Sequence, residues 1–85
     1  IMTAPRKPSA LERHAAAIAD EFKLSAREFE ILELLGQGFT AQGIAKRMVI
    51  SPYTVQTHIK HIYQKMGIHS RTELLDYLTL RQTDA

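Results

Sequence analysis

The chain has 85 residues, of which 45% are hydrophobic and 24% are charged, and its formal net charge is +2 at pH 7. This length suits one small domain and is too short for two hydrophobic cores. No apolar run approaches the roughly 18–20 residues that a transmembrane helix needs, no signal-peptide pattern opens the chain, and without cysteine there is no disulfide framework. We therefore expect a cytoplasmic domain, with a membrane-bound segment outside this chain as the open alternative.

The first segment, residues 1–23, is predicted to be a flexible lead-in followed by one helix. Pro5 and Pro8 stand in a stretch without apolar periodicity, and Ser9 precedes Glu12 by three residues, which is a capping-box spacing. The apolar residues that follow recur at helical intervals: Leu11, Ala15, Ile18 and Phe22. We expect a helix over about 10–22, either appended to the next segment or ending a linker.

The next segment begins with a second capping box. Ser25 is followed three residues later by Glu28, and the apolar residues behind them suit a helix buried in a core: Phe29, Ile31, Leu32, Leu34 and Leu35. Gly36 and Gly38 are placed to end this helix. Thr40 can then cap a third helix, which we expect over 40–48.

A break of three residues, 49–51, separates that helix from the next. Ser51 supplies a cap, and Pro52 stands at the first helical position, where a missing backbone N–H costs nothing. We expect the fourth helix over 52–66, because Gly67 follows it in the position of a helix stop.

A last capping box, Ser70 with Glu73, opens a helix that we expect over 71–80. Its apolar residues are Leu74, Leu75, Leu78 and Leu80. Residues 81–85 are predicted to be a tail. No alternating strand pattern competes anywhere in the chain, so the predicted fold class is all-α.

Acidic residues are missing from a long internal segment. Between Leu34 and Thr72 there is no Asp or Glu, although five basic residues lie there: Lys46, Arg47, Lys60, Lys65 and Arg71. This segment therefore carries a formal charge of +5, whereas the rest of the chain carries −3. Such segregation indicates an anionic partner, although an ordinary solvated face is the alternative.

The predicted helix 52–66 has two different faces when each residue is advanced by about 100°. One face is apolar and is expected to be core: Val55, Ile59, Ile62 and Met66. The opposite face carries hydroxyl, amide and ammonium groups: Tyr53, Gln56, Thr57, Lys60 and Gln64. These groups can bond to base edges and phosphates, and a short turn joins this helix to 40–48, as in a helix-turn-helix.

Spaced clusters of residues complete a pattern that covers most of the chain. They are Leu24 to Glu28, Ile31-Leu32, Leu35, Gly38-Phe39-Thr40, Ile44-Ala45, Ile50-Ser51, Thr54-Val55, His58, Ile62-Tyr63, Lys65-Met66-Gly67 and Ser70-Arg71 with Glu73. Over 24–80 this pattern resembles the LuxR-type DNA-binding domain, the four-helix effector of quorum-sensing receptors and of one class of bacterial response regulators. The resemblance implies a four-helix helix-turn-helix bundle, here with an additional N-terminal helix. It also implies sequence-specific binding of double-stranded DNA as the C-terminal effector domain of a transcriptional regulator, with 40–48 as scaffold and 52–66 in the major groove.

The resemblance also implies a role for individual positions. Base contacts fall to Gln56, Thr57 and Lys60. Phosphate contacts fall to Thr40, Lys46, Ser51, Thr54, His61 and Lys65. The family dimerises through its last helix, whose candidate contacts here are Tyr77 and Leu80. RNA polymerase and a sensory domain upstream of this chain are the further partners that the resemblance implies.

Two positions depart from the family pattern. The family often has lysine where Gln56 stands, and glutamine prefers adenine where lysine would favour guanine. An acid that is usual in the scaffold helix is replaced by Gly43, which costs that helix about 1 kcal/mol relative to alanine. The sequence gives no reason for Gly43.

Two further expectations concern charged and metal-binding side chains. We expect Arg71 to brace the domain by pairing with an acid of the helix that starts near Ser25, with Glu28 as the candidate. His58 and His61 stand three residues apart, as two metal-binding imidazoles can. Because the chain has no cysteine and the sequence offers no nearby carboxylate, we expect no metal site and no cofactor.

Three other functions were considered: an enzyme, a module that docks a protein, and a module that binds RNA. No Gly-rich phosphate loop, nucleophile with a placed base or carboxylate pair is found, so binding without catalysis is predicted. A helix-turn-helix that docks a protein of the transcription machinery would want apolar anchors, and only Tyr53 is available. An RNA-binding module would want exposed aromatic side chains for stacking, which are scarce.

Overall fold

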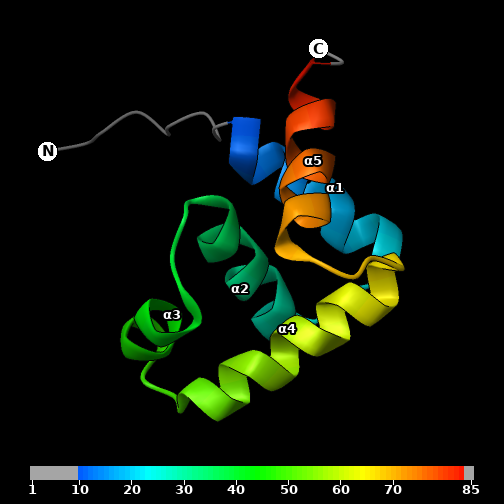
Figure 1. Ribbon diagram of the computed structural model, residues 1–85. Coiled ribbons are helices and arrows are strands. Elements are labelled where there is room, and N and C mark those ends of the chain that lie inside the picture. Colours follow the sequence, from blue (N-terminus) through cyan, green and yellow to red (C-terminus); the bar gives the residue numbers. More distant parts are fainter. Residues whose placement is uncertain (1–9, 84–85) are drawn as a thin grey trace, which may run out of the picture.

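The computed structural model describes residues 10–83, with side chains described over 11–78, and all regular structure in this part is helical (Figure 1). The elements are α1 (Ala10–Phe22), α2 (Ala26–Gly36), α3 (Ala41–Met48), α4 (Pro52–Met66) and α5 (Arg71–Thr83). The predicted all-α class, four helices preceded by an additional one, is confirmed. No helix within 10–83 is long and apolar enough to cross a membrane.

Helices α2, α3 and α4 begin directly after the capping residues predicted from the sequence, Ser25, Thr40 and Ser51. The Ser25 N–H donates to Glu28 Oε1 at 2.8 Å, and the Glu28 N–H donates back to Ser25 Oγ at 3.2 Å. Thr40 Oγ1 accepts from the Gly43 N–H at 3.1 Å, and Ser51 Oγ accepts from the Thr54 N–H at 3.1 Å. Each bond satisfies a backbone donor that has no partner inside its helix.

One core joins all five helices. Its buried apolar side chains are Ala15, Ile18, Ile31, Leu32, Leu35, Ile44, Ala45, Val55, Ile62, Met66, Ile68, Leu74 and Leu78. The predicted core face of α4 is therefore correct, except that Ile59 is only half-buried. Fully burying one such aliphatic side chain stabilises a fold by about 1.5–3 kcal/mol, so a small domain depends on every member.

The first helix packs more closely than its position outside the family pattern suggested. Ala15 and Ile18 of α1 are fully buried, and α1 lies against both α2 and α5 (Figure 1). A Cβ at Gly36 would stand 2.7 Å from a methyl carbon of Leu11 and 3.0 Å from one of Leu78. Gly36 therefore allows α1 and α5 to approach the end of α2. The division at residue 23 stays a prediction, while residues 1–9 of the lead-in lie outside the described part.

Two expectations about the C-terminal helix need correction. The helix continues to Thr83, beyond the predicted end at residue 80. Arg71 does not pair with Glu28: its Nη2 donates to the carbonyl oxygen of Leu35 at 3.0 Å. The reason is position, because Arg71 opens α5 beside the C-terminal end of α2, where backbone carbonyls lack helical partners, and Glu28 is near the other end.

The arrangement leaves α4 along one edge of the molecule. In Figure 1, α4 runs along the lower edge, with its N-terminal half near α3, whereas α1 and α5 lie together at the top. α4 packs against α2 and α3 through its apolar side. Its opposite side is consequently left facing outward along its length.

Candidate nucleic-acid interface

The turn between α3 and α4 consists of residues 49–51. Val49 adopts the left-handed conformation, with φ 57° and ψ 47°, and its side chain is 87% exposed. The Ile50 N–H then donates to the Ala45 carbonyl at 3.1 Å, which closes the end of α3. With Ser51 as the cap of α4, the chain turns from one helix to the next within three residues, as a helix-turn-helix requires.

The outward face of α4 presents polar groups without a carboxylate. Gln56, Lys60 and Gln64 are exposed, and Tyr53 is 80% exposed on the same face. Thr57 is half-buried, and its hydroxyl donates to the Tyr53 carbonyl at 3.1 Å. Its hydroxyl proton is therefore engaged, so Thr57 offers outward only an acceptor lone pair and a methyl group. The three predicted base-contact residues do lie together on one face.

The N-terminal end of α4 can accept an anion. Ser51 Oγ and Thr54 Oγ1 lie 2.9 Å apart, close enough for one hydroxyl to donate to the other. No acidic residue stands in the first turn of α4. Because helix N-termini carry partial positive charge and unpaired N–H groups, this end suits a phosphate oxygen.

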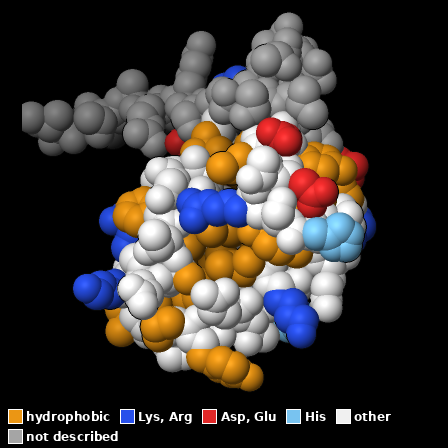
Figure 2. Space-filling model, viewed as in Figure 1, with side chains coloured by type: hydrophobic (Ala, Val, Ile, Leu, Met, Phe, Trp, Pro, Cys, Tyr) orange, Lys and Arg blue, Asp and Glu red, His pale blue; other side chains and the backbone are white. Residues whose placement is uncertain are grey.

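The third helix adds basic side chains near that end. Lys46 and Arg47 are exposed in the last turn of α3, and Thr40 is exposed at its start. The Arg47 guanidinium lies 4.8 Å from the ring centroid of Phe39, a cation–π geometry that holds it in place. On the face drawn in Figure 2, the acidic side chains all lie in the upper half, whereas only Lys and Arg among the charged side chains, apart from His, are seen in the lower half.

Two residues of this surface are not among the DNA contacts predicted from the sequence. Arg47 stood in the acid-free segment, and Tyr53 stood on the polar face of the predicted helix. The signal for Tyr53 was its position on the helix, about 60° from Gln56 and about 20° from Lys60. Arg47 gave no such signal, because its contact with Phe39 depends on the packing of α3.

Two predicted phosphate contacts lie elsewhere. Lys65 Nζ donates to Glu28 Oε1 at 2.7 Å and to the Lys23 carbonyl at 3.2 Å. His61 Nδ1 lies 3.9 Å from Glu28 Oε2. On a helix these two residues are rotated by about 140–180° from Gln56. The structure therefore does not bring them to the exposed polar face.

Glu28 changes the electrostatics of the basic segment. Burial raises the pKa of Glu28, but hydrogen bonds from Lys65 and the Ser25 N–H outweigh burial, so the pKa lies below its ordinary value. Its side chain is 6% exposed and ionised beside Lys65. One of the five basic charges between residues 34 and 72 is thus paired by an acid from α2.

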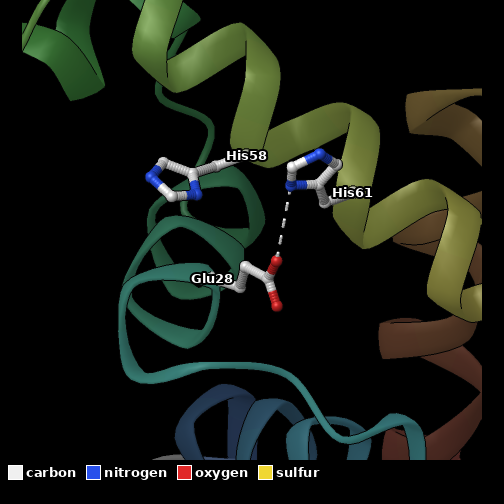
Figure 3. A group of neighbouring side chains, drawn as sticks. All are labelled: Glu28, His58 and His61. Carbon is white, nitrogen blue, oxygen red and sulfur yellow. Dashed lines mark ion pairs between the residues drawn. The ribbon is translucent and has the colours of Figure 1, made fainter.

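The same carboxylate overturns the argument against a metal-binding group. One nitrogen from each of His58 and His61 and one oxygen of Glu28 lie within 4.8 Å of one another (Figure 3). The sequence suggested no nearby carboxylate, because Glu28 precedes His58 by 30 residues. The packing of α2 against α4 brings them together.

Comparison with known proteins gave a family and named relatives. Residues 23–78 match the family described as "Bacterial regulatory proteins, luxR family". A Mycobacterium tuberculosis (strain ATCC 25618 / H37Rv) protein named "Putative HTH-type transcriptional regulator Rv0890c" is 43% identical over 53 residues, 62% of this chain and 6% of that protein. The "Oxygen regulatory protein NreC" of Staphylococcus aureus (strain MRSA252) is 43% identical over 63 residues, 73% of this chain and 29% of that protein.

The chain thus spans less than a third of the length of these curated relatives. No solved structure matches it.

Proposed function

The chain belongs to the luxR family of bacterial regulatory proteins, and we propose that α4 is the helix with which it reads the major groove of double-stranded DNA. The family groups regulators of transcription and is not a class of enzymes. The observation that carries the proposal is the outward face of α4, where Gln56 and Lys60 are exposed beside Tyr53 without any acid. A single helix fits the major groove of B-DNA, and such side chains match its donors and acceptors.

The proposed base contacts differ in what each side chain can recognise. The amide of Gln56 can bond N6 and N7 of adenine at once, and the Lys60 ammonium can donate to O6 and N7 of guanine. Because its hydroxyl proton is engaged, Thr57 is better suited to touch a thymine methyl group. We add Tyr53, whose exposed ring lies on the same face.

The proposed phosphate contacts lie at the two helix starts and on α3. They are Thr40, Lys46, Ser51 and Thr54, with Arg47 added. For Lys65 we propose a role in the fold, since reaching a phosphate would cost it its 2.7 Å bond with a buried carboxylate. His61 lies beside the same carboxylate, and we leave it out of the proposed phosphate contacts. Phosphate contacts fix the register on the duplex, while sequence is read through the bases.

Dimerisation through α5 is part of the proposal. Tyr77 is half-buried, and its ring lies 5.8 Å from that of Phe22 at an angle of 84°. Because this contact lies within the chain, only the remaining surface of Tyr77 is available to a second copy. The side chain of the other predicted anchor, Leu80, lies outside the described residues. Leu75 is 38% exposed and lies about 160° around α5 from Tyr77, so it offers a second contact. Two recognition helices about 34 Å apart would then enter successive major grooves.

Several partners follow from the family only as proposals, because the curated relatives are much longer than this chain. They are an upstream sensory domain, RNA polymerase, and a position at the C-terminal end of a regulator. The docking of a protein by α4 remains the less favoured alternative, because within the described side chains Tyr53 is the only large exposed apolar group on this face.

A direct experiment compares three nucleic acids of one generic sequence. The chain is titrated against duplex DNA, the single strand and the matching RNA at several salt concentrations. We expect duplex DNA to bind best, with log K falling against log salt at a slope of about −4 to −5 for roughly four to six phosphates per monomer. A slope near zero, or equal binding of all three, would contradict the proposal.

A further inference from the structure

We propose that Glu28, His58 and His61 form a binding site for a divalent transition-metal ion of the zinc type, which would tie α4 to α2. The site lies on the flank of α4 away from Gln56, so it is separate from the proposed DNA-reading face. Figure 3 shows both imidazoles on neighbouring turns of α4, above the carboxylate of α2.

The distances suit capture of an ion after small side-chain movements. The three ligand atoms lie within 4.8 Å of one another, and His61 Nδ1 lies 3.9 Å from Glu28 Oε2. Metal–ligand bonds of about 2.0–2.1 Å in a tetrahedral site place ligand atoms about 3.4 Å apart. The side chain of His61 is 50% exposed, so it has room to rotate by the distance required.

A second observation that supports the metal site is an unpaired nitrogen of His58. Its Nδ1 is buried and makes no hydrogen bond. An unsatisfied buried polar atom is costly, and a metal ion is one partner that would satisfy it. His14 Nδ1 shares this condition, but His14 belongs to no group of three ligand side chains in the part of the chain that is described.

The carboxylate is already held in the orientation that a ligand needs. Oε1 of Glu28 accepts bonds from the Ser25 N–H and from Lys65, whereas Oε2 faces His61. Hydrogen bonds of this kind orient metal ligands in proteins. Lys65 also adds positive charge beside the ion, so we expect weaker binding than in four-ligand structural zinc sites. Two imidazoles and one carboxylate leave a fourth position for water.

The test titrates the chelator-treated protein with Zn²⁺ by calorimetry and follows its melting temperature. We expect one ion per chain and a melting temperature that rises with the logarithm of the zinc concentration. Co²⁺ serves as a spectroscopic probe, because a tetrahedral cobalt site gains visible absorption. No uptake of either ion near one equivalent would overturn the proposal.

Two variants separate this site from general binding by surface histidines. His61→Gln removes a half-exposed ligand and should abolish the one-equivalent binding, while the protein remains folded by circular dichroism. His69→Gln is the matched control, since His69 is exposed on the α4–α5 loop and outside the group of three. The proposal fails if His61→Gln binds zinc as wild type does, or if His69→Gln loses as much binding.

Discussion

Lys65 Nζ lies 2.7 Å from Glu28 Oε1 and so fastens the C-terminal half of α4 to the start of α2. The carboxylate is 6% exposed and also closes the capping box with Ser25, so a single side chain joins the start of one helix to the packing of another. This contact is the basis for proposing that Lys65 serves the fold instead of the DNA.

Replacing Lys65 by methionine should lower stability more than DNA affinity. The substitution leaves the Glu28 carboxylate buried without its cation, which we expect to cost about 1–3 kcal/mol of unfolding free energy. Urea unfolding and duplex binding at a temperature where both proteins are folded measure the two effects. Lys60→Met is the control, since Lys60 is exposed and should show the opposite pattern. If Lys65→Met leaves the stability unchanged and weakens DNA binding, Lys65 contacts a phosphate and not only Glu28.

Glu33 should make stability depend on pH in the sense opposite to Glu28. Burial raises the pKa of Glu33, and the carboxylates of Glu12 and Glu30 raise it further. Its contribution to stability is therefore full below the unfolded pKa and is lost as pH rises through the folded pKa. Glu33→Gln should raise the melting temperature at pH 7 and change it little below about pH 4.

The control for that experiment is Asp20→Asn, which removes one exposed acid of α1. If both substitutions raise the melting temperature equally at pH 7, the effect reflects net charge and not the surroundings of Glu33.

The structure has room for a methyl side chain at Gly43. A Cβ there would meet Thr40 Oγ1 at 3.4 Å and Phe39 Cδ1 at 3.5 Å, which are ordinary contacts. Gly43→Ala should therefore stabilise α3 by about 0.5–1 kcal/mol in urea unfolding. Gly67→Ala is the contrasting variant, because Gly67 has φ +69° and alanine there should cost about 1–2 kcal/mol. A destabilised Gly43→Ala would show that α3 needs a glycine for another reason.

One pair of substitutions tests which side of α5, that of Tyr77 or that of Leu75, makes the dimer contact. Tyr77→Glu removes a ring that packs on Phe22, so it should lower stability as well as any dimer contact. Leu75→Glu changes a 38% exposed side chain and should leave the fold intact. Sedimentation with duplexes bearing one or two half-sites measures cooperative loading. If both variants load two half-sites as wild type does, α5 is not the dimer contact.

What the sequence revealed depended on how far apart the interacting residues stand. The caps at Ser25, Thr40 and Ser51 bond to a backbone N–H three residues away, so a local pattern was enough to predict three helix starts. Periodicity likewise predicted which side of α4 is buried. Bonds between distant residues left no such pattern.

Arg71 shows this limit clearly. It was expected to meet a carboxylate, yet it bonds the Leu35 carbonyl 36 residues away. A backbone acceptor cannot be recognised from residue types, because every residue carries one. The Phe22–Tyr77 ring contact similarly required α1 to pack on α5, and α1 lay outside the pattern that identified the family.

The most direct test of the central claim measures how Gln56→Ala and Lys46→Ala change base-pair preference. Each protein is titrated against duplexes in which every position of a binding site, selected from random sequences by the wild type, is changed in turn. We expect Gln56→Ala to lose about 1–3 kcal/mol of discrimination at one base pair. Lys46→Ala should weaken all duplexes alike. If Gln56→Ala keeps the full preference at every base pair, or if the two variants behave identically, the exposed face of α4 does not read the DNA.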